Sequence, residues 1–188
     1  MNNIAQDKNI YGNSKNWANW MANLDPRTCN DCEDNHGKIF PVSILKQLKS
    51  RPVKKHPFGH CIYVPMRTKP VGTATNQGEN GADFYLYHYN KLPAYYIDKQ
   101  TAYNAGWKTT EENINKLFPG MSIGGDIYNN DDMKLPSTPE RIWREADINY
   151  TGSKRRNRQR ILYSSDGLMF ATYDHYHTFY EITHKETI

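Results

Sequence analysis

The stretch IWREADINYTGSKRRNRQRILYSSDGLMFATYDHYHTFYEI, Ile142 to Ile182, decides the fold of this chain. It contains short runs rich in β-branched and aromatic residues, separated by polar turns, and this pattern is typical of consecutive strands. The predicted strands are Ile142–Tyr150, Gln159–Ser164, Leu168–Tyr173 and Thr178–Ile182, with Ser122–Tyr128 as a fifth ahead of them. Short connections between successive strands favour antiparallel pairing.

Helices are predicted before the strands. Ala82–Asn90 and Asp98–Ala105 have helical patterns, and Gly106 is well placed to end the second. A third helix opens at Thr109 and ends before Pro119. Helices followed by a run of strands indicate an α+β domain. The sequence therefore predicts N-terminal helices packed on a five-stranded antiparallel sheet.

The first third of the chain reads differently. A short helix is predicted over Asn13–Leu24, because Trp17 and Met21 lie four residues apart, and another over Val42–Leu48. Lys69–Gly81 has the composition of a linker. We expect a small, mostly irregular module at residues 1–66, a linker at 67–81 and the α+β domain at 82–188.

Charge and hydropathy narrow the class of protein. The chain has 188 residues and a net charge of +4, and the basic excess lies entirely in residues 1–90. No apolar run approaches the roughly 18 residues of a membrane span, and the start lacks the pattern of a signal peptide. We therefore expect a soluble protein without a signal peptide and without a membrane partner.

One predicted strand carries two carboxylates on a single face. Alternation places Glu145 and Asp147 beside Trp143 on one side of Ile142–Tyr150, opposite the core side. By itself this pattern also fits an ordinary half-solvated strand. The basic run from Lys154 to Arg160 likewise fits either a solvated loop or an anion site.

Several motifs occur in a recognisable order. They are LPAYYIDK (Leu92–Lys99), AGW (Ala105–Trp107), PGMSIGGDIYNN (Pro119–Asn130), KLP (Lys134–Pro136), WREADINYT (Trp143–Thr151), RILYSSD (Arg160–Asp166) and DHYHTF (Asp174–Phe179). In order and spacing, residues 82–182 resemble the barnase and binase family of bacterial guanyl-preferring ribonucleases. This resemblance implies the microbial ribonuclease fold and endoribonuclease activity without a catalytic cofactor.

The resemblance also implies the catalytic roles. RNA cleavage needs a base to take the 2′-OH proton and an acid to protonate the departing 5′-oxygen. Glu145 matches the family's general base and His175 its general acid. The residues matching the substrate phosphate site are Lys99, Arg156, Arg160 and Tyr176, with Arg155 as the alternative to Arg156 because of a one-residue insertion in this loop.

The loop that reads the base departs from the family pattern. Asn129, Asn130 and Asp132 occupy the base-recognition positions, where the relatives typically show Ser-Asn-Arg-Glu. Asp132 keeps a carboxylate that is one methylene shorter, and Asp131 replaces the arginine. We expect guanine preference to persist with a smaller margin.

The three cysteines lie in the first third, and their odd number in a chain without a signal argues against a disulfide framework. Residues 1–66 resemble the end of phage head-morphogenesis (minor head) proteins, with a CxxC at Cys29 and Cys32. With Cys61 and either His56 or His60, these residues could form a closed structural zinc site. The alternative is a degenerate remnant that binds no metal.

Together these resemblances imply a phage-associated or polymorphic toxin that cleaves RNA. A barstar-like acidic inhibitor is the expected partner, since an anionic protein could occupy the basic phosphate site. The expected location is the cytoplasm or a phage particle, with delivery by a non-classical route. The alternatives are a phage structural or docking protein with a vestigial nuclease domain, and a nucleic-acid-binding module without catalysis.

Overall fold

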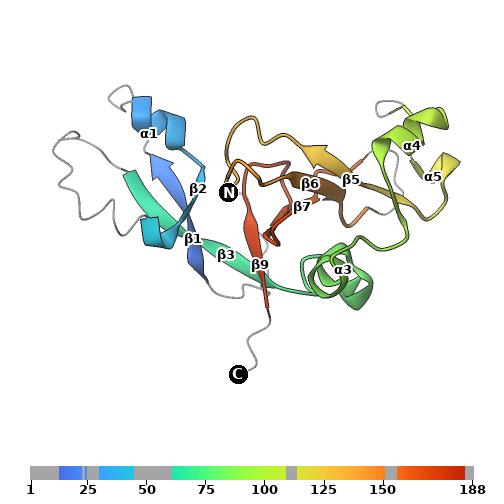
Figure 1. Cartoon of the computed structure of the whole chain (residues 1–188), viewed down its shortest axis with the longest axis horizontal. Helices are drawn as coiled ribbons and strands as arrows, with labels where there is room; N and C mark the ends of the chain where they lie inside the picture. Colours follow the sequence, from blue (N-terminus) through green and yellow to red (C-terminus); the bar gives the residue numbers. More distant parts are fainter. Residues whose placement is uncertain are drawn as a thin grey trace, which may run out of the picture.

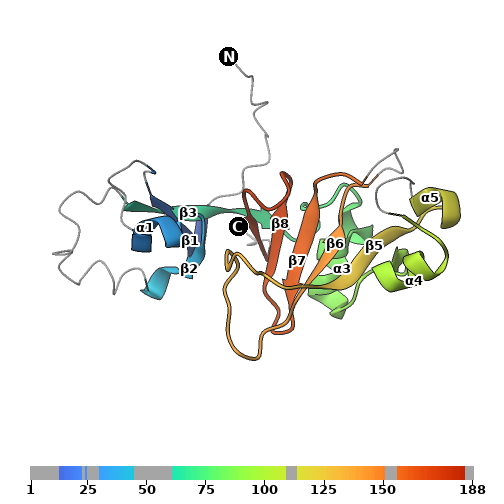
Figure 2. The same ribbon diagram turned by 90° about the horizontal axis from the view of Figure 1, so that it is seen from above.

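The structure, a computed structural model, describes residues 13–22, 24, 30–44, 61–108, 114–150 and 156–184. The described residues form a mixed nine-stranded sheet with the strand order β2-β1-β3-β9-β8-β7-β6-β5-β4 (Figures 1 and 2). The strands are β1 (Asn13–Ala22), β2 (Ile39–Pro41), β3 (Cys61–Pro70), β4 (Tyr96–Ile97), β5 (Ser122–Tyr128), β6 (Trp143–Asp147), β7 (Arg160–Ser164), β8 (Met169–Thr172) and β9 (Tyr180–Thr183).

Five of these strands correspond to the predicted ones, but the five-stranded antiparallel sheet was wrong in extent. Among themselves, strands β5 to β9 pair antiparallel, as expected. At the two ends, however, β4 pairs parallel with β5, and β3 pairs parallel with β9. An open sheet leaves unpaired N–H and C=O groups at its edges, and these added strands satisfy them.

The N-terminal module is built from strands, so the irregular module and the helix over Asn13–Leu24 were both wrong. Strand β1 covers most of that segment and pairs antiparallel with both β2 and β3. A spacing of four fits a helix, but it is also even, so Trp17 and Met21 fit the period of a strand equally well. Pairing with β3 decided between the two. A short helix, α1 (Asn30–Asn35), follows, and the second predicted helix is described only at residues 42–44.

The predicted helices of the C-terminal half are present where the structure describes them. They are α3 (Ala82–Tyr89), α4 (Lys99–Asn104) and α5 (Ile114–Leu117), with a 3₁₀ turn, η1 (Gly78–Asn80), ahead of α3. Residues 109–113, where the third helix was expected to open, lie outside the described part. None of the described helices is long and apolar enough to cross a membrane.

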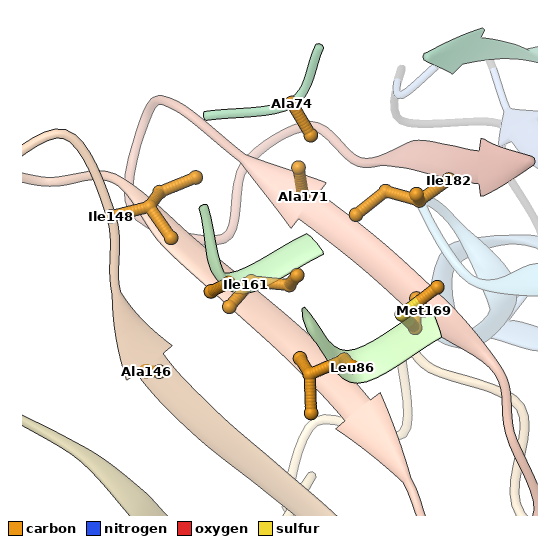
Figure 3. Packing of buried hydrophobic residues seen from close by; sticks show 9 residues of the cluster. Ala74, Leu86, Ala146, Ile148, Ile161, Met169, Ala171 and Ile182 are labelled. Carbon is orange, nitrogen blue, oxygen red and sulfur yellow. The ribbon is translucent and has the colours of Figure 1, made fainter. Parts of the chain in front are cut away.

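Helix α3 covers one face of the sheet. Leu86 packs with Ile148, Ile161 and Met169 in a buried cluster that also includes Ala74 (Figure 3). The segment before α3 is anchored by buried Asp83, whose carboxylate accepts hydrogen bonds from the N–H groups of Gly72 and Ala74 and from the Thr75 hydroxyl. The predicted linker thus contributes to this core at Ala74, while the domain boundaries stay a prediction.

The other face of the sheet has a second buried cluster. It contains Trp143 from β6, Leu162 from β7 and Phe170 from β8, residues that alternate with those facing α3. Glu145 shares this face, because it lies two residues after Trp143. The second face therefore carries the candidate site.

Candidate active site

The proposed general base lies at the centre of β6. Glu145 is 8% exposed, and its Oε1 accepts a hydrogen bond from Lys99 Nζ at 2.7 Å. Its Oε2 accepts a hydrogen bond from the Tyr176 hydroxyl. The structure thus brings together three of the predicted site residues, from β6, the start of α4 and the loop between β8 and β9.

The electrostatics of this contact favour the carboxylate form. Burial alone raises the pKa of Glu145, but the hydrogen bonds from Lys99 and Tyr176 and the positive charges of Lys99 and Arg160 outweigh it, and the net pKa is lowered. A base must be ionised before it can accept a proton. Glu145 is therefore ionised at neutral pH.

Two predicted phosphate ligands share one buried anion. Arg156 forms two hydrogen bonds to the carboxylate of Asp147, at 2.7 and 2.6 Å, and Arg160 Nε lies 2.9 Å from the same carboxylate. Asp147 is 2% exposed, and Arg160 is 4% exposed. Because two guanidinium groups flank one carboxylate, a net positive charge remains beside Glu145. That charge is what an RNA phosphate would meet.

The proposed general acid lies in a left-handed turn. His175 and Tyr176 both have positive φ values, 62° and 67°, which non-glycine residues adopt at a cost in free energy. The carboxylate of Asp174 holds the turn by accepting hydrogen bonds from the N–H groups of His177 and Thr178 and from the hydroxyls of Thr172 and Thr178. The turn presents the His175 side chain to solvent.

The pKa of the His175 imidazole is lowered, although the negative charge of Glu145 acts to raise it. Partial burial and the positive charges of Arg160 and Arg158 outweigh it. The cations predicted to bind phosphate therefore also make the His175 imidazole easier to deprotonate.

A bulge in β5 positions Lys99. The register between β5 and β6 shifts between Gly124 and Asp126, and Gly125 adopts a φ of 100° there. A Cβ on Gly124 would lie 2.5 Å from the Ala146 Cβ, so only glycine fits at this close strand contact. Beyond the bulge, the carboxylate of Asp126 accepts a hydrogen bond from the backbone N–H of Lys99 at 3.1 Å, where α4 begins.

The predicted base-recognition residues line one pocket. Ile127, Tyr128, Asn129, Asn130, Asp131 and Asp132 surround a cavity of about 350 Å³. Tyr128 stacks on Tyr176 with ring centres 5.3 Å apart, so the pocket adjoins the side chain that is hydrogen-bonded to Glu145. Burial and the nearby Asp132 carboxylate raise the pKa of Tyr128 to about 12, which keeps its hydroxyl neutral.

The side chains of this loop have different partners. The Asn130 amide is buried, where it accepts a hydrogen bond from Leu135 N–H and donates to the Leu135 carbonyl, so it shapes the loop. Asp132 is exposed, and its Oδ2 lies 3.2 Å from Lys134 Nζ. The carboxylate that replaces the family's glutamate is thus already paired within the loop.

Three positioning carboxylates were not predicted: Asp126, Asp147 and Asp174. Each lies inside a motif quoted from the sequence, and Asp147 also shares a strand face with Glu145. That shared face was the available signal for Asp147. Nothing in local periodicity points to the partner of Asp126, because Lys99 lies on another element. The partners of Asp174 lie within its own turn and at the end of the preceding strand.

Most of the predicted zinc site lies outside the described residues. Cys29, His56 and His60, and the side chain of Cys61, lie outside the described residues. Cys32 is described, and it is 4% exposed within α1. Three cysteine thiolates and one imidazole would suit Zn²⁺. The zinc site stays a prediction.

Comparison with known proteins identifies the family of the C-terminal part of the chain. The sequence profile of the ribonuclease family matches residues 79–183. Ribonucleases from Heyndrickxia coagulans, Bacillus intermedius and Bacillus pumilus are each 48% identical to the chain over 103 residues, or 55% of its length. The match covers 94% of the first and 63% of each of the other two. The profile match begins at residue 79, so the phage resemblance of residues 1–66 stays a prediction. The chain belongs to the ribonuclease family and is a barnase-like endoribonuclease.

Proposed function

We propose that the protein cleaves single-stranded RNA in two steps. In the first step the ribose 2′-oxygen attacks the adjacent phosphorus, Glu145 takes the 2′-OH proton, and the bond to the 5′-oxygen breaks. His175 gives its proton to that departing oxygen, and a 2′,3′-cyclic phosphate forms. In the second step water attacks the phosphorus, His175 takes a proton from the water, and the bond between the phosphorus and the 2′-oxygen breaks. Glu145 returns its proton to that oxygen, and a 3′-phosphate forms.

The observation that carries this proposal is the contact between Glu145 and Lys99. A carboxylate with a lowered pKa, held by an ammonium at 2.7 Å, is a base next to a cation that can also hold a phosphate oxygen. Arg160 and Arg156 add positive charge where the phosphorane gathers negative charge. Tyr176 keeps the second oxygen of Glu145 in place.

The decisive experiment compares single substitutions at the two proton-transfer residues. Glu145→Gln and His175→Ala should each lower kcat/KM on RNA by at least about 100-fold, because general acid–base catalysis commonly contributes 10²–10⁴. Glu140→Gln and His177→Ala are matched controls, since these side chains are exposed. Cleavage by His175→Ala at the wild-type rate would overturn the assignment. Added EDTA should leave cleavage unchanged.

We also propose guanine preference on the 5′ side of the cut, with a narrower margin over adenine than a longer carboxylate would provide. The pocket beside Tyr128 supports base binding, and Asp132 supplies the acceptor for the base's N–H groups. Its pairing with Lys134 and its short side chain both limit its reach.

We further propose that the protein acts as a phage-associated or polymorphic toxin and is restrained by an acidic, barstar-like inhibitor. The positive charge around Asp147 supports such a partner, because an anionic surface would be attracted to it. Induced expression in a bacterial host should arrest growth for the wild type and not for Glu145→Gln. Equal growth of both strains would contradict the toxin role.

A further inference from the structure

The N-terminal module, defined here as β1 to β3 with α1, lies outside the segment matched to the ribonuclease family, yet it contacts the loop that lines the base pocket. The backbone N–H of Ile39, at the start of β2, donates a hydrogen bond to the Lys134 carbonyl at 2.9 Å. Both ribbon views show the loop after β5 reaching across to β2 (Figures 1 and 2).

Apolar packing reinforces that hydrogen bond. Ile39 and Met66, which are 4% and 0% exposed, belong to the same buried cluster as Leu135 of the loop. Leu135 is the residue whose N–H and C=O are both bonded to the Asn130 amide. From β1, Trp17 makes an edge contact with Phe170 at 6.2 Å. The module thus closes the core beneath the base pocket.

Lys134, the residue that Ile39 holds, also links the base pocket to the catalytic turn. Its Nζ donates to the Tyr176 carbonyl at 3.2 Å and lies 3.2 Å from the Asp132 carboxylate. Asn130 and Met133, which precede Lys134 in this loop, have positive φ values of 53° and 51°. Such backbone conformations persist only when surrounding contacts enforce them.

We propose that the N-terminal module sets the conformation of the base-binding loop and that Ile39 is a positioning residue for base selectivity. The inference rests on the proposed function, in which residues 129–132 bind the base. If the contact loosens, only a fraction of molecules has the loop in its binding conformation, and affinity for the preferred base falls by that fraction. A base that binds the pocket weakly has little affinity to lose, so its KM should change little.

The test measures kcat and KM on the dinucleotides GpN and ApN with the full-length protein. Ile39→Ala should raise KM for GpN about fivefold and leave ApN within about twofold, so the G-over-A ratio of kcat/KM falls. Ile39→Val removes a single methyl group and should lower the ratio by a smaller factor than Ile39→Ala. Val64→Ala is the matched control from β3, where Val64 is 41% exposed, and it should leave the ratio unchanged.

A folded Ile39→Ala protein with an unchanged G-over-A ratio would overturn the inference, as would an equal loss on both dinucleotides. If Ile39→Ala does not fold, hydrogen exchange of Ile39→Val decides: faster exchange at residues 130–135 than in the wild type, with β8 unchanged, supports the inference, and equal exchange overturns it. The wild type is measured first. If it does not distinguish GpN from ApN, base reading itself fails and the inference falls with it.

Discussion

Glu145 and His175 belong to one site but have opposite exposure. Glu145 is buried and held by Lys99 and Tyr176, whereas His175 is exposed on a turn whose backbone, not its ring, is tied down. Both groups have lowered pKa values. A lowered pKa keeps a general base ionised, as its role requires, but it leaves a smaller fraction of a general acid protonated. The two pKa values together set the pH dependence of cleavage.

We expect the pH profile of kcat/KM for RNA cleavage to be bell-shaped with an acidic optimum. Cleavage needs Glu145 ionised, so the acid limb lies below its ordinary pKa of 4.5. It also needs His175 protonated, so activity is lost as the pH rises through a pKa below 6.5. Arg158→Gln removes one cation that lowers the His175 pKa, and the alkaline limb should move to higher pH. Arg144→Gln, an exposed arginine on β6, is the control. An unmoved alkaline limb in Arg158→Gln would contradict this assignment.

Base preference should depend on the length of one side chain. Asp132→Glu restores the longer carboxylate, and we expect the ratio of kcat/KM on GpN to that on ApN to rise about threefold or more. A charge-assisted hydrogen bond is worth about 1.5–3 kcal/mol, which leaves room for such a gain. Asp132→Ala should lower the ratio. If Asp132→Ala leaves it unchanged, the carboxylate does not read the base.

At the scale of elements, the site depends on carboxylates that hold cationic or strained segments in place. Asp147 on β6 holds Arg156 and Arg160, and Asp174 holds the turn of His175. The bulge in β5 brings Asp126 to the start of α4, where it fixes the backbone of Lys99. Asp126 and Asp147 thus connect neighbouring elements of the site, and Asp174 holds the turn in which it lies.

We expect Asp147→Asn to lower both stability and activity. Removing one partner of a buried ion pair leaves uncompensated charge and costs about 3 kcal/mol or more, and here two guanidinium groups lose their anion. Chemical denaturation should show that loss, and kcat/KM should fall because Arg156 and Arg160 are no longer oriented. Asp166→Asn, which breaks the surface pair with Arg141, should cost at most about 1 kcal/mol. Equal effects of the two substitutions would contradict this account.

At the scale of the whole molecule, one sheet runs from the N-terminal module through the ribonuclease strands. Strand β3 pairs with β9 over four residues on each strand, and Ile39 and Met66 share a core with Trp143 and Phe170. A continuous sheet with a shared core has no weak boundary at which the two parts could unfold separately. The module is therefore expected to be part of the cooperative unit.

We expect the full-length chain to unfold in one thermal transition. Trp17→Ala, on β1, removes the edge contact with Phe170 and should lower the Tm of that transition by several degrees, since about 1 kcal/mol shifts Tm by roughly 2–4 °C in a chain of this size. Differential scanning calorimetry measures this, with Val64→Ala as control. Two separate transitions, with only one moved by Trp17→Ala, would show that the module unfolds independently.

Local patterns predicted much of the site and part of the fold. The strands from β5 to β9, the helices α3 and α4, and the shared face of Glu145 and Asp147 all follow from periodicity and motifs. Ile142 lies on the side of its predicted strand opposite Glu145, where the core was expected, but it is 48% exposed because β6 begins one residue later. The segment from Asn13 to Ala22 was taken for a helix, because its apolar spacing fits both periods.

The sequence by itself therefore determined the α+β order and, through its ordered motifs, the ribonuclease family, since these depend on residue types at short spacing along the chain. The roles of Glu145 and His175 follow from the family resemblance and stay a prediction. Only the tertiary structure decided that β3 joins the sheet beside β9, that Ile39 holds Lys134, and that the pKa of His175 is lowered. The physical reason is distance along the chain. Edge pairing, core closure and the balance of charges around an imidazole depend on groups far apart in sequence, and their energies exist only once folding has brought those groups together.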